Sequence, residues 1–177
     1  MAVSIELIKQ LRDMTLASVA DCKKALDDAQ GDLAKASVLL KKRGLEIAAK
    51  KASRAANQGR IEAYVHTGNK IGVVLEVNCE TDFVARNEEF VRFTKDVAMQ
   101  IAASAPLCVN IEEVPAQALA EFNEAQRQDY AKTHCLLDQP FIRDPKQTIR
   151  DYLTSIVARL GENIVVRRFC RFKIGEE

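Results

Sequence analysis

Few side chains in this sequence have the chemistry of a catalytic site. Cys79 is the strongest nucleophile candidate, because His66 lies near it across a predicted hairpin and Asp82 follows closely in the sequence. A cysteine nucleophile also needs an oriented base and an oxyanion pocket, and the sequence has no glycine-rich loop or nucleophile elbow. Since a cysteine on a buried strand is usually a small apolar filler, we predict that the protein is not an enzyme.

Metal and cofactor sites have still less support. The two histidines and five scattered cysteines include no C-x-x-C pair and no metal-ligand spacing. P-loop and dinucleotide fingerprints are also missing from the sequence. We therefore expect no metal and no cofactor. The odd number of cysteines argues against a disulfide framework and for a reducing compartment.

A basic segment extends from Lys41 to Arg60, with Glu46 as its one acid. Such a segment can bind the phosphate backbone of RNA, face an acidic protein surface, or be a solvated connector. No aromatic side chain is interleaved with the basic ones, which weakens the case for single-strand binding. The formal charge of the whole chain is only +1, so a nucleic-acid partner would have to be recognised by this local patch.

The most informative stretch is NCETDFVARNEEF, residues 78–90. It places Phe83 directly after Asp82, between an apolar strand and a helix that Asn87 can cap. Phe83 is either a core residue at the end of the strand or an aromatic anchor presented outward to a partner. In the second case Asp82 would bring a negative charge to the same partner, which suits a surface that disturbs a metal or phosphate site elsewhere.

The elements around this stretch predict an α+β protein in three parts. Residues 1–44 predict a module of three short helices, the second capped by Ser18 and the third ended by Gly44. Residues 45–59, rich in Ala and Lys, predict an exposed helical connector ending near Gly59. Residues 60–177 predict a core domain in which helices cover a small, mainly antiparallel sheet.

Apolar alternation defines the expected faces of this sheet. In the first strand of a hairpin, Ile61, Ala63 and Val65 are expected to face inward. In the last strand one face is expected to carry Ile164, Val166, Cys170, Phe172 and Ile174, and the other Arg167, Arg171 and Lys173. Pro115 and Asp144-Pro145 are expected to open two further helices.

The chain resembles the elongation factor Ts family in several long, ungapped motifs. NCETDFVARNEEF resembles the family signature, and residues 21–44 resemble its amino-terminal module, which is similar to ubiquitin-associated domains. Residues 138–145 and 160–175 resemble the carboxy-terminal part of short, bacterial or plastid-type members. The resemblance covers nearly the whole chain.

This resemblance implies a guanine-nucleotide exchange factor for elongation factor Tu. It implies that Asp82 and Phe83 are brought against the elements that hold magnesium and GDP, while Thr81 and Val84 shape the turn and Arg86 supports it. It also implies that the helical module docks on the nucleotide-binding domain of elongation factor Tu. Val19, Asp21 and Cys22 are the candidate docking contacts. The alternative function is a ribosome- or RNA-associated protein that binds through the basic segment.

Partners and location follow from the same features. No apolar run approaches the roughly 18 residues of a membrane span, and the amino terminus has the pattern of folded structure rather than of a signal. We expect a cytoplasmic protein, or one from the matrix or stroma of a bacterially derived organelle. Short members of the family are expected to form homodimers, and nucleic acid is not expected as a partner.

Two departures from the family pattern bear on these expectations. TLASVADCKKAL replaces the usual TGAGMMDCKKAL, so the loop of residues 16–20 lacks both glycines and their access to positive φ. The segment 125–136 is shorter than in typical short members. The first change affects the docking contact. The second affects the homodimer, although Cys170 and the basic last strand could still contribute to a dimer interface.

Overall fold

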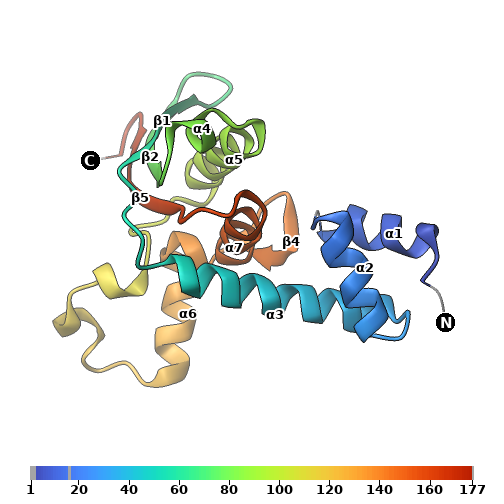
Figure 1. The fold of residues 1–177 in the computed structure, drawn as a ribbon. Coiled ribbons are helices and arrows are strands. Elements are labelled where there is room, and N and C mark those ends of the chain that lie inside the picture. Colours follow the sequence, from blue (N-terminus) through green and yellow to red (C-terminus); the bar gives the residue numbers. More distant parts are fainter. Residues whose placement is uncertain (1–2, 16, 177) are drawn as a thin grey trace. The chain divides into compact units, whose positions relative to one another are not determined.

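The computed structural model of the protein describes residues 3–15 and 17–176, so Leu16 of the altered loop lies outside the described residues (Figure 1). The chain divides into two compact units. One extends to Arg54 and includes Thr154–Asn163; the other comprises Ala55–Leu153 and the residues from Ile164 onward. The predicted α+β class is confirmed, because a helical module accompanies a small antiparallel sheet packed against helices.

Three helices form the first unit's apolar core: α1 (Ile5–Thr15), α2 (Val19–Asp28) and α3 (Leu33–Lys51). The predicted caps are present, since the side chains of Ser18 and Asp32 accept hydrogen bonds from the backbone N–H groups of Asp21 and Lys35. The core of the module consists of Leu11, Cys22, Ala25, Leu26, Ala29 and Ala36. Each helix alone would be marginal in water, so this shared core is what holds the module together.

The prediction that Gly44 ends the third helix is wrong. Helix α3 continues through Gly44 to Lys51, so the expected connector is mostly the second half of that helix. Gly44 is buried against α7 (Ile149–Leu160), where a Cβ would lie 3.6 Å from Thr154 Cγ2. That is an ordinary contact distance, so a small side chain would also fit at this position. Gly59, the expected end of the connector, lies instead in a strand, where a side chain would collide with the backbone of Val77.

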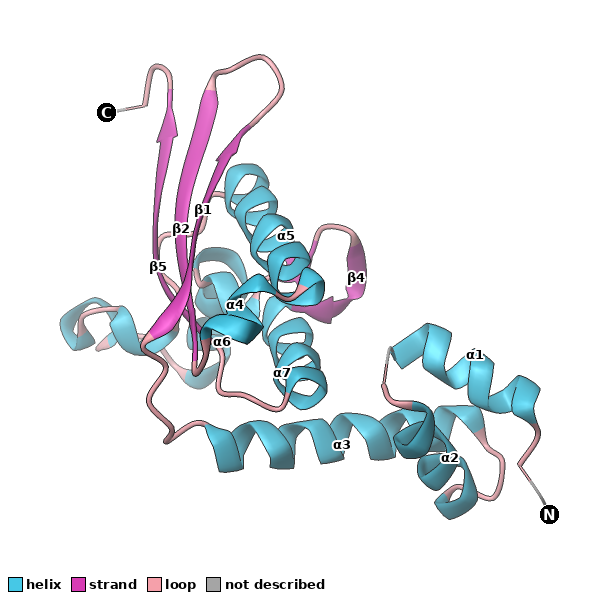
Figure 2. Ribbon diagram, turned by 45° about the horizontal axis from the view of Figure 1, so that its top comes forward, coloured by secondary structure: helices cyan, strands magenta, loops and turns pink. Residues whose placement is uncertain are grey.

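The second unit contains a three-stranded antiparallel sheet with the order β1-β2-β5 (Figure 2). Its strands are β1 (Gln58–Val65), β2 (Ile71–Cys79) and β5 (Val165–Lys173). Helix α5 (Glu88–Ser104) packs against β1 and β2 with a buried stripe of Phe90, Thr94, Val97 and Ile101, as predicted. The short helix α4 (Asp82–Arg86) lies between β2 and α5 in the chain and contacts both β1 and β2.

The predicted face of β1 is wrong, and that of the last strand is confirmed only for Ile164 and Val166, which are buried. In β1 the inward residue is Glu62, whose carboxylate binds Arg60 Nε at 2.7 Å and Thr94 Oγ1 at 3.2 Å, while Ile61 and Val65 are exposed. In β5 a bulge leaves Arg167 without a partner position in β2 and reverses the alternation beyond it. Cys170, Phe172 and Ile174 are therefore exposed, whereas Arg171 turns inward and donates to Ala102 O.

The remaining elements follow α5 in the second unit. They are η1 (Ile111–Glu113), η2 (Ala116–Leu119), α6 (Glu124–His134), η3 (Leu136–Asp138), β3 (Pro140–Phe141) and β4 (Asp144–Thr148). The helix expected from Pro115 is only the short η2, because Asn123 starts α6 separately with a capping box. The helix expected from Asp144 begins instead at Ile149, after β4.

Candidate functional site

The five predicted exchange residues lie on α4 and its amino-terminal cap. Thr81 is the N-cap, and its Oγ1 accepts a hydrogen bond from Val84 N at 3.4 Å. Asn87 closes the other end, donating from its backbone N–H to Val84 O at 3.0 Å, and its side chain caps α5 by accepting from Glu89 N at 2.8 Å. The expected turn is therefore a one-turn helix joined without a linker to a long buried one.

Below this helix, the buried Cys79 anchors the strand end. Its Sγ donates to Thr81 O at 3.1 Å, so the residue that caps α4 is tied directly to β2. Val84 is half-buried and fixes the inner side of α4. Cys79 thus acts as a small core residue with a weak S–H donor, which agrees with its interpretation as a structural cysteine.

Phe83 points away from all of this packing. Its side chain is 85% exposed, more than any other large apolar residue of the described chain. The interpretation of Phe83 as a core residue at the strand end is therefore wrong. Exposing a Phe on a rigid, doubly capped helix forgoes about 1.5–3 kcal/mol of burial, and such exposure suits an aromatic anchor for a partner.

Asp82 and Arg86 form an ion pair along the same helix. Arg86 Nη2 lies 3.0 Å from Asp82 Oδ2, at the i,i+4 spacing that brings two side chains together on a helix surface. Both side chains are mostly exposed, so the pair is screened by solvent and contributes little to stability. The Asp82 carboxylate thus remains at the surface beside Phe83, free to exchange its partner.

A groove beside α4, lined by several charged residues, was not predicted from the sequence. It has a volume of about 680 Å³ and lies between β1, α4 and α5. Its lining includes Arg86 together with Glu62, Tyr64, Arg92, Lys95, Asp96 and Arg143. Arg143 Nη1 binds Asp96 Oδ1 at 2.7 Å, and Tyr152 donates to the other carboxylate oxygen at 3.1 Å. The i,i+3 spacing of Arg92 and Lys95, close in the sequence to Arg86, was the one sequence feature that could have indicated this groove.

The three docking candidates of the helical module differ in exposure. Val19 is exposed, and Asp21 is half-exposed, bound to Ser18 Oγ at 2.7 Å and to Arg43 Nη1 at 3.0 Å. Cys22 is completely buried in the core of the module, where burial raises the pKa of its thiol. Val19 and Asp21 are therefore the two whose side chains a partner could reach.

Known proteins with similar sequences identify the family. The family model described as Elongation factor TS matches residues 4–134, which span the helical module, the hairpin, α4 and α5.

The chain belongs to the elongation factor Ts family.

Curated relatives in this family align with almost all of the chain. An elongation factor Ts of Anaeromyxobacter sp. is 49% identical over 98% of the chain and 89% of the relative. Those of Caldanaerobacter subterraneus and Carboxydothermus hydrogenoformans are 47% and 46% identical over 98% of the chain and 98% and 90% of their own lengths. These alignments are 195 residues long, although the chain has 177, so elongation factor Ts relatives contain residues with no counterpart here.

Membership in the elongation factor Ts family makes the protein a translation elongation factor of the nucleotide-exchange class. Within residues 3–15 and 17–176, the helices include none long and apolar enough to cross a membrane. The same described residues contain no cluster of three His, Cys, Asp or Glu side chains that could hold a metal ion.

Proposed function

We propose that this protein promotes GDP release from elongation factor Tu by inserting Phe83 and Asp82 of α4 near the partner's magnesium and nucleotide site. The observation that carries the proposal is the 85% exposure of Phe83 on a helix fixed at both ends. A mobile loop would lose conformational entropy when it met the partner. The capped α4 has already lost that entropy on folding, so contact energy is available to deform the partner.

In this mechanism the two side chains have different tasks. Phe83 is the apolar wedge, and Asp82 disturbs the polar network around the magnesium ion. Thr81 and Val84 hold the helix that carries them, while Arg86 supports Asp82 through the 3.0 Å ion pair. The protein performs no covalent chemistry and needs no cofactor of its own.

Burial of Phe83 alone does not supply enough free energy to release GDP. Burial of one Phe contributes about 1.5–3 kcal/mol, whereas weakening GDP binding by ~10⁴-fold needs about 5.5 kcal/mol of coupling. The rest must come from other contacts that favour the distorted partner, including docking of the helical module through Val19 and Asp21. Because coupling is reciprocal, GDP should weaken binding of this protein to elongation factor Tu by the same factor.

A homodimer is the second part of the proposal, and the outer face of the sheet supports it. Exposed apolar side chains project from this face on all three strands or just beyond them: Ile61, Val65, Val74, Phe172 and Ile174. Apolar faces of this kind mark interaction sites. A second copy offers the same face, so a two-fold axis through it would bury both patches at once.

The basic segment supplies the alternative function. Its Lys41, Lys42 and Lys50 side chains are exposed on α3, while Arg43 is held by Asp21. Binding of RNA through several phosphates would fall steeply as salt rises. Binding of elongation factor Tu through an aromatic anchor would fall much less. Titration with tRNA and with elongation factor Tu between 50 and 300 mM KCl separates the two functions.

The decisive experiment is stopped-flow release of a fluorescent GDP analogue from elongation factor Tu. With excess unlabelled GDP as the trap, addition of this protein should accelerate release by orders of magnitude in a concentration-dependent way. A protein with this activity would act in the cytoplasm, or in the matrix or stroma of a bacterially derived organelle, where elongation factor Tu is found. Release that does not accelerate at any concentration would reject the exchange function and leave RNA binding as the function to test.

A further inference from the structure

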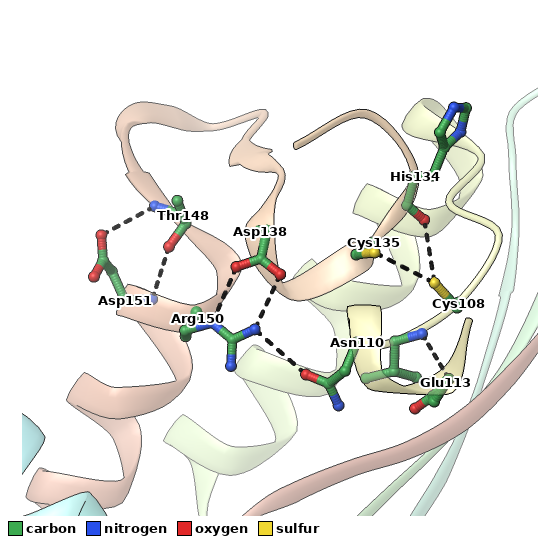
Figure 3. A network of polar contacts seen from close by, with 10 residues as sticks. Cys108, Asn110, Glu113, His134, Cys135, Asp138, Thr148, Arg150 and Asp151 are labelled. Carbon is green, nitrogen blue, oxygen red and sulfur yellow. Dashed lines mark hydrogen bonds and ion pairs between the residues drawn. The ribbon is translucent and has the colours of Figure 1, made fainter. Parts of the chain in front are cut away.

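Two cysteines outside the proposed exchange site lie unusually close together. Cys108 Sγ is 3.4 Å from Cys135 Sγ, and both thiols are free (Figure 3). Cys108 follows α5 and Cys135 follows α6, so 27 positions separate them in the chain. The exchange function uses neither residue, and their spacing in the sequence carries no motif.

The backbone holds these two residues directly opposite each other. Cys108 and Cys135 form a parallel β-bridge, with Leu136 N donating to Cys108 O at 2.9 Å and Leu107 N donating to His134 O at 2.8 Å. Paired strands lie about 4.7–4.9 Å apart, which falls inside the roughly 4.4–6.8 Å between Cα atoms that a disulfide spans. The sulfurs can therefore approach bonding distance by side-chain rotation, without moving the backbone.

Polar contacts fix the segments on both sides of the pair. Arg150 binds both carboxylate oxygens of Asp138, at 3.1 and 3.0 Å, and reaches Asn110 Oδ1 at 3.4 Å. Glu113 accepts a hydrogen bond from Val109 N at 3.0 Å. Figure 3 shows these contacts surrounding the two sulfurs, with the imidazole of His134 turned away and only its carbonyl directed at Cys108. The two thiols are thus held as a pair.

We propose that Cys108 and Cys135 form a dithiol site that reacts with low-molecular-weight disulfides and closes into an intramolecular disulfide. Cys108 is half-buried and within reach of a small reagent, whereas Cys135 is 0% exposed. The Cys108 thiolate attacks one sulfur of the reagent and releases the first small thiol. Cys135 then loses its proton, attacks Cys108 Sγ and releases the second. Two protein thiols are oxidised and one reagent disulfide is reduced to two thiols.

The cross-link would close a long stretch of the second unit that has few buried apolar residues. Between Val109 and Cys135, only Leu119 and Ala131 are buried apolar residues of the described chain. Closing so long a loop restricts the unfolded chain strongly. The oxidised protein should therefore melt about 5–10 °C higher than the reduced protein, and dithiothreitol should reverse the shift.

The surroundings also set the pH dependence of this reaction. Burial raises the pKa of the Cys108 thiol, and it raises the pKa of Cys135 to about 12. The nearby carboxylates of Glu112, Glu113 and Asp138 act in the same direction. Since only the thiolate attacks, oxidation should be slow at neutral pH and accelerate about tenfold from pH 7 to pH 8.

Mass spectrometry of the full chain tests the proposal. The reduced protein is incubated with oxidised glutathione at pH 8, alkylated and digested with trypsin. The expected product joins peptides 96–127 and 133–143, the two that contain Cys108 and Cys135. The link should disappear in Cys108→Ser and persist in the matched control Cys170→Ser, which removes the exposed single thiol. A stable glutathione adduct on Cys108 without the link, or a link to Cys170, would overturn the proposal.

A second probe needs no oxidation and guards against misfolding of a variant. Phenylarsine oxide bridges two adjacent thiols, so it should add once, tightly, to the reduced wild-type protein and to Cys170→Ser. Its affinity for Cys108→Ser should fall at least 100-fold. If the wild-type protein binds it no better than Cys108→Ser does, the two thiols do not act as a pair.

Discussion

The protein exposes apolar side chains in two different ways, on α4 and on the outer face of the sheet. On α4 a single aromatic, Phe83, is the one strongly exposed large apolar side chain of a capped helix. On the sheet, exposed apolar side chains from β1, β2 and β5 form a broad patch with no such isolated centre. The first can enter a narrow site, whereas the second can only cover a surface.

This difference separates two kinds of association. A single anchor concentrates its contact energy at one point of the partner and leaves little area to hold the complex together, which suits transient action. A broad apolar face gains from total area and suits a lasting interface. We therefore propose that α4 acts on elongation factor Tu and that the sheet mediates self-association. Substitutions on α4 that weaken self-association, or substitutions on the sheet that slow GDP release, would refute this division.

The largest expected effect is on the sheet. Phe172→Glu places a charge in the proposed dimer interface, and symmetry makes the change count twice. Loss of two buried Phe side chains at about 1.5–3 kcal/mol each should weaken dimerisation by more than about 100-fold. Sedimentation equilibrium measures this directly. If the wild-type protein stays monomeric at high concentration, the proposed role of the sheet in self-association is wrong.

Phe83→Ala should have the next largest effect, and on a different measurement. Loss of about 1.5–3 kcal/mol of contact should reduce acceleration of GDP release by about 10- to 150-fold. Because Phe83 is exposed, thermal stability should not change. Phe172→Ala is the matched control, since it removes an exposed Phe from the other surface. If Phe172→Ala slows release as much as Phe83→Ala does, the assignment of the two surfaces is wrong.

The sequence analysis located α4 better than the sheet face, for a physical reason. Residues 78–90 combine turn-type polar residues, an aromatic and a cap within a short stretch, and all of these signals are local. The face of a strand depends on alternation, which a bulge reverses. The bulge beside Arg167 depends on pairing with β2, and no pattern within β5 marks it. The inward carboxylate of Glu62 likewise has a distant partner, Thr94, that the pattern of β1 does not reveal.

Gly44 shows the same limit in the helical module. A glycine after an apolar helical pattern is a standard stop signal, although the Ala- and Lys-rich residues that follow Gly44 also favour helix. The helix nevertheless continues through Gly44, which is buried beside Thr154 and Ala158 of α7, more than a hundred positions along the chain. Among the docking candidates Cys22 proved to be buried, as its helical spacing with Leu26 and Ala29 on one apolar face indicates.

A substitution with a smaller expected effect tests whether GDP release depends on the caps that hold α4 as well as on Phe83. Asn87→Ala removes the side chain that caps α5 and follows α4, which should cost about 1 kcal/mol. The melting temperature should fall by about 2–4 °C, and GDP release should slow a few-fold if Phe83 needs this frame. Asn123→Ala is the matched control, because Asn123 caps α6 by a comparable bond of 2.9 Å. It should lower stability equally and leave release unchanged.

The smallest expected effect concerns the ion pair between Asp82 and Arg86. An exposed i,i+4 pair contributes about 0.3–0.5 kcal/mol at most, so Asp82→Asn, Arg86→Gln and the double variant should have similar melting temperatures. GDP release should separate them, because Asp82 is proposed to act on the partner whereas Arg86 only supports it. Asp82→Asn should slow release several-fold and Arg86→Gln less than twofold.

The double variant decides between action and support. If Asp82 acts on the partner by itself, the double variant should release GDP at the rate of Asp82→Asn, because Arg86 has no further task once its acid is gone. Equal losses in both single variants, with no further loss in the double variant, would mean that the two side chains act as one unit. Asp82 would then belong to the frame of α4, and Phe83 would be the only side chain on it that acts directly on elongation factor Tu.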